Sequence, residues 1–247
     1  MYLNTRGLVL RVSDYNDRDA LLTLLTSEHG KITVKARGLR RKNSPLTAPC
    51  QLLALGEYTL FEYRDSYSVN EAQSIELFQG LRKDLVKLSL GTYFAQVSEL
   101  LSMEDTPNSE LLSLVLNCLY ALSDMPVREN QVKAVFELRC ACLSGYSPDL
   151  FGCHICGNQT PDRFDVSKGM LSCASCHHIG QTGIRMPVSP SVLSAMRYIV
   201  YCEPKRLLSF DASDETLKQL AQITELYLTT QLERGFSSLD FYKSLFL

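Results

Sequence analysis

In the first 77 residues, apolar and polar side chains alternate with a period near two, which indicates β-strands. The pattern is clearest where Ile32, Val34 and Ala36 share one face of an expected strand. Five short strands in about 75 residues predict a small closed barrel such as an OB-fold, and an SH3-like barrel fits nearly as well. The five strands are expected at residues 7–12, 20–26, 31–37, 53–63 and 67–75.

After Gly80 the apolar residues recur at helical spacing, which predicts core-facing helices. Gly145 is suited to the left-handed conformation that follows a helix, so the third helix is expected to end there. Ser189 can cap a later helix that begins at Pro190. Another helix is expected to begin at Ser213, with Asp214 and Glu215 in its first turn. The tail at residues 238–247 is a short amphipathic helix or an ordered strand. The first three helical stripes lie at residues 90–101, 111–122 and 132–143.

The composition is that of an ordinary globular protein, with 45% hydrophobic and 21% charged residues among 247. No apolar run approaches the roughly 20 residues that span a bilayer. The first twelve residues alternate like a strand and lack the features of an export signal. We therefore expect a soluble cytoplasmic protein with no membrane partner, whose nine cysteines are kept reduced.

Two pairs of cysteines have the spacing of a metal site, each pair with two residues between its members and sixteen residues between the pairs. Two intervening residues let one tight turn present both thiolates to a tetrahedral zinc ion. Residues 163–171 are expected to form a hairpin between the pairs, which predicts a zinc ribbon at residues 150–186. The four expected ligands are Cys153, Cys156, Cys173 and Cys176.

An Fe–S cluster or two redox-active motifs could use the same four thiolates, but the segment lacks a redox context. Four thiolates fill the tetrahedron and leave no position for water, so we expect one structural Zn²⁺ and no catalytic metal. The nearby His154, His177 and His178 are then expected to be solvent-exposed. The other cysteines lie in apolar surroundings and are expected in the core; they are Cys50, Cys118, Cys140, Cys142 and Cys202.

Positive charge is concentrated at the start of the chain, although the net charge of the whole is only −2. Residues 1–50 carry nine Lys or Arg and four acidic residues, a local net charge of +5. Such a basic region favours a polyanion as partner, and a solvated basic face is the alternative.

The motifs of the common enzyme classes that bind nucleotides or act through a nucleophile are absent. The sequence has no phosphate-binding G-x-x-x-x-G-K-[ST] loop, no G-x-G-x-x-G, no H-E-x-x-H and no G-x-S-x-G. We therefore expect a protein that is not an enzyme.

With a barrel, helices and a ribbon in this order, the sequence resembles the RecO family of bacterial recombinational-repair mediators over essentially its whole length. The residues that carry the resemblance are His29-Gly30-Lys31, Ala36-Arg37-Gly38 with Arg40-Arg41-Lys42, Tyr93 to Leu111, Phe136-Glu137-Leu138, Gly145-Tyr146 and Ser238 to Tyr242. The resemblance implies an α+β multidomain protein, with an OB-fold that binds nucleic acid at residues 1–80 and a helical domain at 81–247. Some relatives have lost the ribbon, which implies that zinc is scaffolding.

The resemblance further implies the partners and the activity. Such a protein binds single- and double-stranded DNA, anneals complementary strands, contacts single-strand-binding protein and, with RecR, helps RecA to load. It would be associated with the nucleoid in the cytoplasm. Cationic side chains on a strand and the following loop would neutralise phosphates. The expected DNA-binding residues are Lys31, Lys35, Arg37, Arg40, Arg41 and Lys42.

Aromatic side chains near these cations could stack on bases. Alternation places Phe61 and Tyr63 on one face of their strand and Tyr58 on the other, so part of the set, which also includes Tyr67, must be core.

The acidic tail of single-strand-binding protein, which ends in an apolar residue, requires an apolar groove with a cation at its rim. The helical domain offers Lys133 or Arg139 for this role. Two rival functions are an adaptor whose ribbon and helices bind only proteins, and a zinc enzyme, which would need an open metal position.

Overall fold

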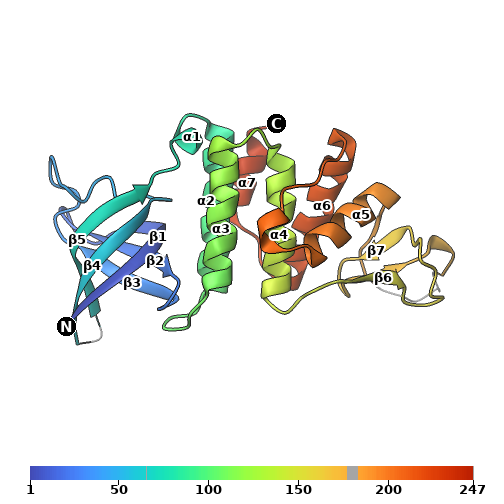
Figure 1. Ribbon diagram of the computed structural model, residues 1–247, viewed down its shortest axis with the longest axis horizontal. Coiled ribbons are helices and arrows are strands. Elements are labelled where there is room, and N and C mark those ends of the chain that lie inside the picture. The colour runs from blue at the N-terminus through green and yellow to red at the C-terminus, as the bar shows by residue number, and fades with distance from the viewer. Residues whose placement is uncertain (65, 177–182, 247) are drawn as a thin grey trace. The chain divides into compact units, whose positions relative to one another are not determined.

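The computed structural model describes residues 1–64, 66–176 and 183–246 (Figure 1). The chain folds into two compact units. Unit 1 comprises Met1–Pro126 and Phe236–Leu247, and unit 2 comprises Val127–Gly235. No helix among the described residues combines the length and the apolar character that crossing a bilayer requires.

Unit 1 begins with the closed five-stranded barrel. Its strands are β1 (Tyr2–Asp14), β2 (Ala20–Thr26), β3 (Lys31–Ala36), β4 (Leu55–Tyr63) and β5 (Ser66–Glu76). Their order around the barrel is β1-β2-β3-β5-β4, and β1 closes it by pairing with β4 as well as β2. Only β3 and β5 run parallel among these pairs. This arrangement is that of an OB-fold, so the fold prediction is confirmed and the SH3-like alternative is excluded.

The first strand is longer than predicted, because it begins at Tyr2 instead of Gly7. Residues 2–8 pair with β4, and residues 7–14 pair with β2. The first five residues of the strand are exposed or half-buried, whereas Gly7, Leu8, Val9 and Leu10 are all buried, so the expected strand began where continuous burial begins.

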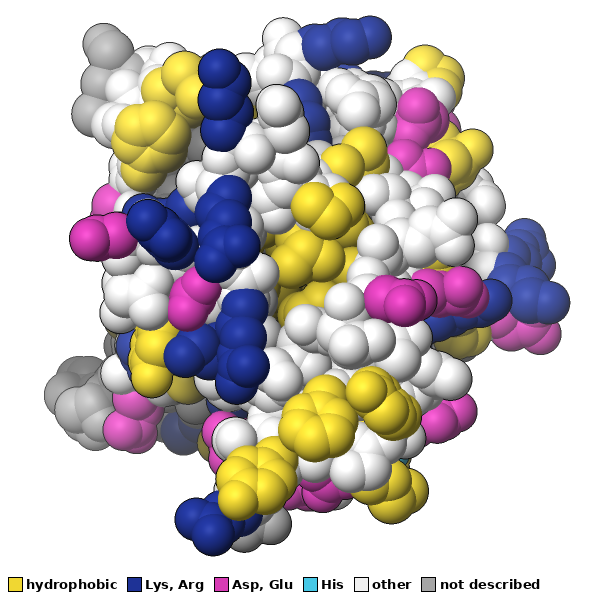
Figure 2. Space-filling model, turned by 90° about the vertical axis from the view of Figure 1, so that its left-hand side faces the viewer, with side chains coloured by type: hydrophobic (Ala, Val, Ile, Leu, Met, Phe, Trp, Pro, Cys, Tyr) yellow, Lys and Arg dark blue, Asp and Glu magenta, His cyan; other side chains and the backbone are white. Residues whose placement is uncertain are grey.

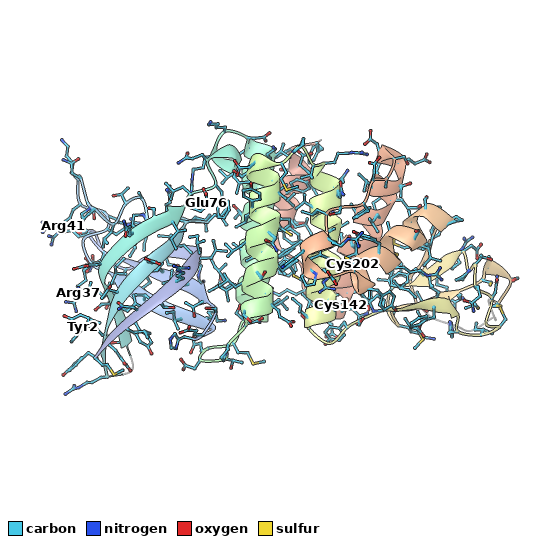
Figure 3. All side chains as sticks on the ribbon, in the orientation of Figure 1. Tyr2, Arg37, Arg41, Glu76, Cys142 and Cys202 are labelled. Carbon is cyan, nitrogen blue, oxygen red and sulfur yellow. The ribbon has the colours of Figure 1, made fainter. Side chains whose placement is uncertain are left out.

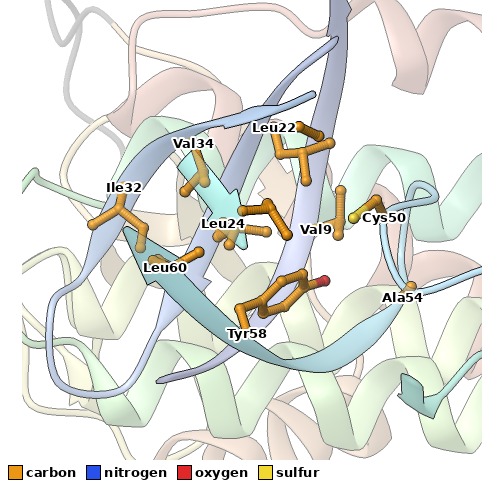
Figure 4. Packing of buried hydrophobic residues seen from close by; sticks show 11 residues of the cluster. Val9, Leu22, Leu24, Ile32, Val34, Cys50, Ala54, Tyr58 and Leu60 are labelled. Carbon is orange, nitrogen blue, oxygen red and sulfur yellow. The ribbon is translucent and has the colours of Figure 1, made fainter. Parts of the chain in front are cut away.

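The barrel interior is packed with side chains from every strand (Figure 4). Ile32, Val34 and Ala36 all face this core, as the alternation predicted. Tyr58 is buried among them and donates its hydroxyl hydrogen to the Pro49 carbonyl oxygen at 2.6 Å. That bond joins the core to the loop between β3 and β4, which forms a series of hydrogen-bonded turns.

The helices of unit 1 are α1 (Gln79–Arg82), α2 (Leu85–Leu101), α3 (Ser109–Asp124) and α7 (Ser237–Ser244). The change from strands to helices falls at residue 79, close to the expected residue 80. Asp84 caps α2 by accepting hydrogen bonds from the N–H groups of Val86 and Lys87. The helix α7 packs on α2, where the Tyr93 and Phe236 rings meet edge to face at 5.5 Å.

Unit 2 contains α4 (Glu129–Leu143), α5 (Pro190–Tyr201) and α6 (Asp214–Gln231). The expected helix starts are confirmed, because Ser189 and Ser213 accept hydrogen bonds from N–H groups in the first turns of α5 and α6. Between α4 and α5 lies a small sheet of order β6-β8-β7-β9. Its strands are β6 (Asp149–Cys153), β7 (Arg163–Asp165), β8 (Met170–Ser172) and β9 (Arg185–Pro187).

Candidate metal centre and nucleic-acid interface

The small sheet of unit 2 brings the two cysteine pairs together. The strand β6 ends at Cys153, and the turn after it is closed by a hydrogen bond from the Gly157 N–H to the Cys153 carbonyl oxygen at 2.9 Å. Gly157 has a φ of 73°, a left-handed conformation that glycine adopts without steric cost. The second pair follows the β7–β8 hairpin, and the Cys176 N–H donates to the Cys173 carbonyl oxygen at 3.1 Å. The predicted ribbon hairpin is thus confirmed.

The four sulfur atoms lie within 4.8 Å of one another, and the Cys156 and Cys173 sulfurs are 3.8 Å apart. Tetrahedral coordination with Zn–S bonds of about 2.3 Å separates the sulfurs by about 3.8 Å. The Asn158 side-chain amide donates to the Cys173 sulfur at 3.2 Å, and the Cys173 N–H donates to the Cys153 sulfur at 3.4 Å. These four cysteines could therefore hold one metal ion, with N–H donors that stabilise thiolate charge.

Thiol ionisation favours metal binding at Cys153. Burial alone would raise the pKa of this thiol, but hydrogen bonds from the backbone N–H groups of Cys156, Ile155 and Cys173 lower it to about 6. A thiolate is the form that ligates a metal ion.

His154 is exposed, as predicted, and its ring Nδ1 lies 2.8 Å from the Leu171 carbonyl oxygen. His177 and His178 lie outside the described residues. Of the cysteines expected in the core, Cys50, Cys118 and Cys140 are buried, whereas Cys142 and Cys202 are half-buried. Figure 3 labels the latter two.

On the barrel, the polar face of β3 carries the first expected DNA-binding residues. Arg37 is exposed, whereas the Lys31 ammonium donates to the carbonyl oxygen of Glu99 in α2 at 3.1 Å. Lys31 thus helps to fix the barrel to α2. Lys35 is half-buried, with its Nζ 3.8 Å from the Asp19 carboxylate and 4.0 Å from the centre of the Tyr15 ring.

Asp19 is held in its charged form. Hydrogen bonds from the Gly38 N–H and the Asn16 amide, with weaker attraction from Lys35 and Arg41, lower the pKa of the Asp19 carboxyl group. The charge of Lys35 is therefore partly neutralised by this carboxylate, which lies in the connection between β1 and β2.

The loop after β3 carries three further cations, of which Arg40 forms an ion pair with Asp14. Within the described part of the chain, no carboxylate lies at ion-pairing distance from Arg37, Arg41 or Lys42, and all three are exposed. Figure 3 shows Arg37 and Arg41 on the side of the barrel away from the helices of unit 1. We call Arg37, Arg41 and Lys42 the basic edge. Lys and Arg side chains form a line on this face in Figure 2.

The candidate stacking residues divide as alternation along β4 predicted. Tyr58 is buried, whereas Phe61 is 40% exposed and Tyr63 is 57% exposed. Tyr67 is half-buried and packs against the barrel core. Tyr2, which is 61% exposed beside Phe61, was not among the expected stacking residues, because the first strand was expected to begin at Gly7. The strand-like alternation of the first twelve residues was the signal that could have identified it.

The two expected partner-binding cations lie on α4 and make contacts inside unit 2. Lys133 is only 2% exposed, and its ammonium contacts the carboxylates of Glu137 at 2.9 Å and Glu225 at 2.8 Å. Arg139 is half-buried and donates to the carbonyl oxygens of Ile199 and Val200 near the end of α5. Lys133 is therefore an interior residue in this structure, because unit 2 surrounds its ammonium.

Family models and similar proteins agree on the identity of the chain. The model described as Recombination protein O N terminal matches residues 1–78, and Recombination protein O C terminal matches residues 82–240. DNA repair protein RecO of Acetivibrio thermocellus is 33% identical over 246 residues, which cover 99% of this chain and 97% of that protein. DNA repair protein RecO of Alkaliphilus metalliredigens is 29% identical over 248 residues, 99% of this chain and all of that protein. The chain therefore belongs to the RecO family of DNA repair proteins.

Proposed function

We propose that this protein binds single- and double-stranded DNA, anneals complementary strands and, with RecR, helps RecA to load onto DNA coated by single-strand-binding protein. It acts in this proposal without catalysing a reaction. The observation that carries the proposal is the basic edge, three exposed cations without a carboxylate partner among the described residues, on an OB-fold.

The chemistry of the basic edge fits phosphate binding. Arg41 and Lys42 lie in a loop of consecutive turns, and Arg37 lies just before it. Cations that neutralise phosphates release condensed counterions, and this binding is independent of base sequence. A surface that neutralises two complementary strands equally lowers the repulsion between them, which is what annealing requires.

In the proposal, the four cysteines of unit 2 hold one zinc ion. Bound to four thiolates, the ion would join the turn after β6 to the segment after β8 and would have no open position for a substrate. Its role is to stabilise the ribbon, since metal binding and folding are coupled at such sites.

For the acidic tail of single-strand-binding protein, the proposal keeps Arg139 and gives up Lys133. The Arg139 guanidinium donates to helix α5 through one terminal nitrogen, and a guanidinium carries five N–H donors in all. The remaining donors suit a carboxylate at the rim of a groove. The ammonium of Lys133 is already in contact with the carboxylates of Glu137 and Glu225.

DNA binding is tested by replacing all three residues of the basic edge with alanine. Each phosphate contact on a single strand contributes about 0.7 to the slope of log K against log salt, so the R37A/R41A/K42A slope should be smaller by about 2. Affinity should fall to a similar extent for unrelated DNA sequences. Replacing Arg40 should cost less, because Asp14 already neutralises it.

The matched control is K205A/R206A, which removes two exposed cations from a short turn in unit 2 and should leave the slope unchanged. Annealing of complementary oligonucleotides is measured without nucleotide. A folded triple variant with the wild-type slope would place the DNA path elsewhere. A wild-type chain that neither binds nor anneals DNA would favour the adaptor function.

A further inference from the structure

Three aromatic side chains, Tyr2, Phe61 and Tyr63, are exposed together at one end of β1 and β4. Their exposed fractions are 61%, 40% and 57%. The Tyr2 and Phe61 rings lie 5.4 Å apart, and the Arg64 guanidinium lies 5.2 Å from the centre of the Tyr63 ring. We call these three residues the aromatic platform.

The aromatic platform does not fill the barrel. The inner face of β4 at this level is occupied by Tyr58 and Leu60, which are both fully enclosed by the core. Phe61 and Tyr63 point to the opposite side of the strand, because successive side chains alternate. Their exposure leaves apolar ring surface in water, and such clustered exposure marks interaction sites.

The neighbouring strand leaves these rings uncovered. On β5, Ser68 pairs with Phe61 and Ser66 pairs with Tyr63. Directly paired residues place their side chains on the same face of a sheet, so each ring has a small hydroxyl beside it on that strand. Each of these hydroxyls donates to the backbone carbonyl oxygen of the aromatic residue with which it pairs. The ring faces are therefore accessible to another flat group.

The strand register connects the aromatic platform to the cations. Lys35 pairs with Ser68, Ser68 pairs with Phe61, and Phe61 pairs with Tyr2, which makes one row across four strands. Neighbouring strands are about 4.8 Å apart, so the backbones of Lys35 and Phe61 lie about 10 Å apart. Arg37 lies two residues beyond Lys35, in the turn that begins directly after β3. Figure 3 shows Tyr2 on the same side of the barrel as Arg37 and Arg41.

We propose that the aromatic platform stacks on unpaired bases of a DNA strand whose phosphates contact the basic edge. This inference rests on the proposed function and adds to it a preference for single strands. Base–aromatic stacking tolerates any sequence, because every base has a π face. In a duplex the bases are already stacked and paired, so the aromatic platform contributes nothing to duplex affinity.

The adjacent cations favour a nucleic acid over an apolar protein surface as the occupant. Lys35 lies in the same row as the platform, and Arg64 lies over one of its rings. A single DNA strand presents phosphates and π faces together, which matches alternating cations and aromatic rings. A purely apolar partner would supply no counter-charge to the Arg64 guanidinium, whereas Lys35 already has the Asp19 carboxylate beside it.

The chain contains no tryptophan, so Phe61→Trp introduces a single fluorescent reporter into the aromatic platform. Its emission should be quenched by a single-stranded oligonucleotide and unchanged by a duplex of the same length. The control is Tyr120→Trp, at a residue that is 53% exposed on α3, and its emission should not respond to either DNA. Quenching of both reporters alike, or of neither by a single strand that binds, would overturn the inference.

A second variant, Y2A/F61A, tests the contribution to affinity. Each stacked base lost should weaken single-strand binding on the order of 5- to 150-fold, leave duplex binding unchanged and leave the salt slope as in the wild type. Circular dichroism checks that the variant is folded. If Y2A/F61A binds single strands as tightly as the wild type, or loses duplex binding equally, the stacking role is wrong while DNA binding stands. A wild-type chain that binds no DNA contradicts both.

Discussion

Lys133→Met removes a charge from the interior of unit 2 and distinguishes a structural lysine from one that binds a partner. The Lys133 ammonium lies 2.9 Å from Glu137, 2.8 Å from Glu225 and 3.3 Å from the Ala221 carbonyl oxygen. Glu137 is completely buried and also accepts a hydrogen bond from the Thr224 hydroxyl at 2.7 Å. Lys133→Met takes from the buried Glu137 carboxylate the ammonium that it contacts at 2.9 Å.

Removing one partner of a buried ion pair costs about 3–5 kcal/mol of unfolding free energy. With a urea dependence of about 2 kcal/mol per M, the midpoint of the transition of unit 2 should fall by about 2 M. Replacing both members, in K133M/E137L, removes the uncompensated charge and should recover most of the loss, because apolar residues often replace buried pairs at little cost.

The loss should depend on pH with a definite sign. Burial raises the pKa of Glu137 above its ordinary value of 4.5, and the Lys133 ammonium opposes this rise. A carboxyl group with a raised folded-state pKa gives stability that is present below its unfolded pKa and is lost as pH rises through the folded pKa. Lys133→Met raises the folded pKa further, so its destabilisation should be smaller at about pH 5 than at about pH 7.5.

Urea unfolding followed by circular dichroism at both pH values measures these differences, with the single variant Glu225→Gln as a control at a carboxylate that is 21% exposed. A Lys133→Met protein that loses under about 1 kcal/mol, with no dependence on pH, would refute the account of Lys133 as an interior charge that Glu137 requires.

Two further predictions concern unit 2. Metal analysis should find one zinc per chain, and chelation or Cys153→Ser should lower the thermal stability of unit 2, because metal binding is coupled to folding; iron with visible absorbance would contradict this. Arg139→Ala should weaken binding of an acidic peptide with an apolar C-terminal residue by about 10- to 150-fold if a charge-assisted hydrogen bond is lost. Unchanged peptide affinity in a folded variant would exclude Arg139 from that site.

The structural elements that depend on neighbouring residues alone could be predicted from the sequence. The expected strand at residues 20–26 coincides with β2, because its flanking turns are marked by polar residues and glycine. The cysteine cluster was predictable for the same reason, since two intervening residues define the turn at each pair. The helix caps Ser189 and Ser213 also act within one turn of their own positions.

The interactions that the sequence did not indicate are those between distant segments. Pairing of Val34 with Tyr67 decides that the barrel is an OB-fold, and no local pattern encodes this parallel contact. Lys31 and Arg40 were expected on the free surface, but Glu99 and Asp14 hold them. Sequence patterns place charged residues on the surface, so a buried, compensated lysine such as Lys133 contradicts the rule.

The return of α7 to α2 has a consequence for the order of folding during synthesis. Domains generally fold from the N-terminus as the chain emerges. Phe236, whose ring packs against Tyr93, is synthesised only after all of Val127–Gly235. Part of α2 therefore stays uncovered while unit 2 is synthesised, and the segment that completes unit 1 becomes available only after unit 2.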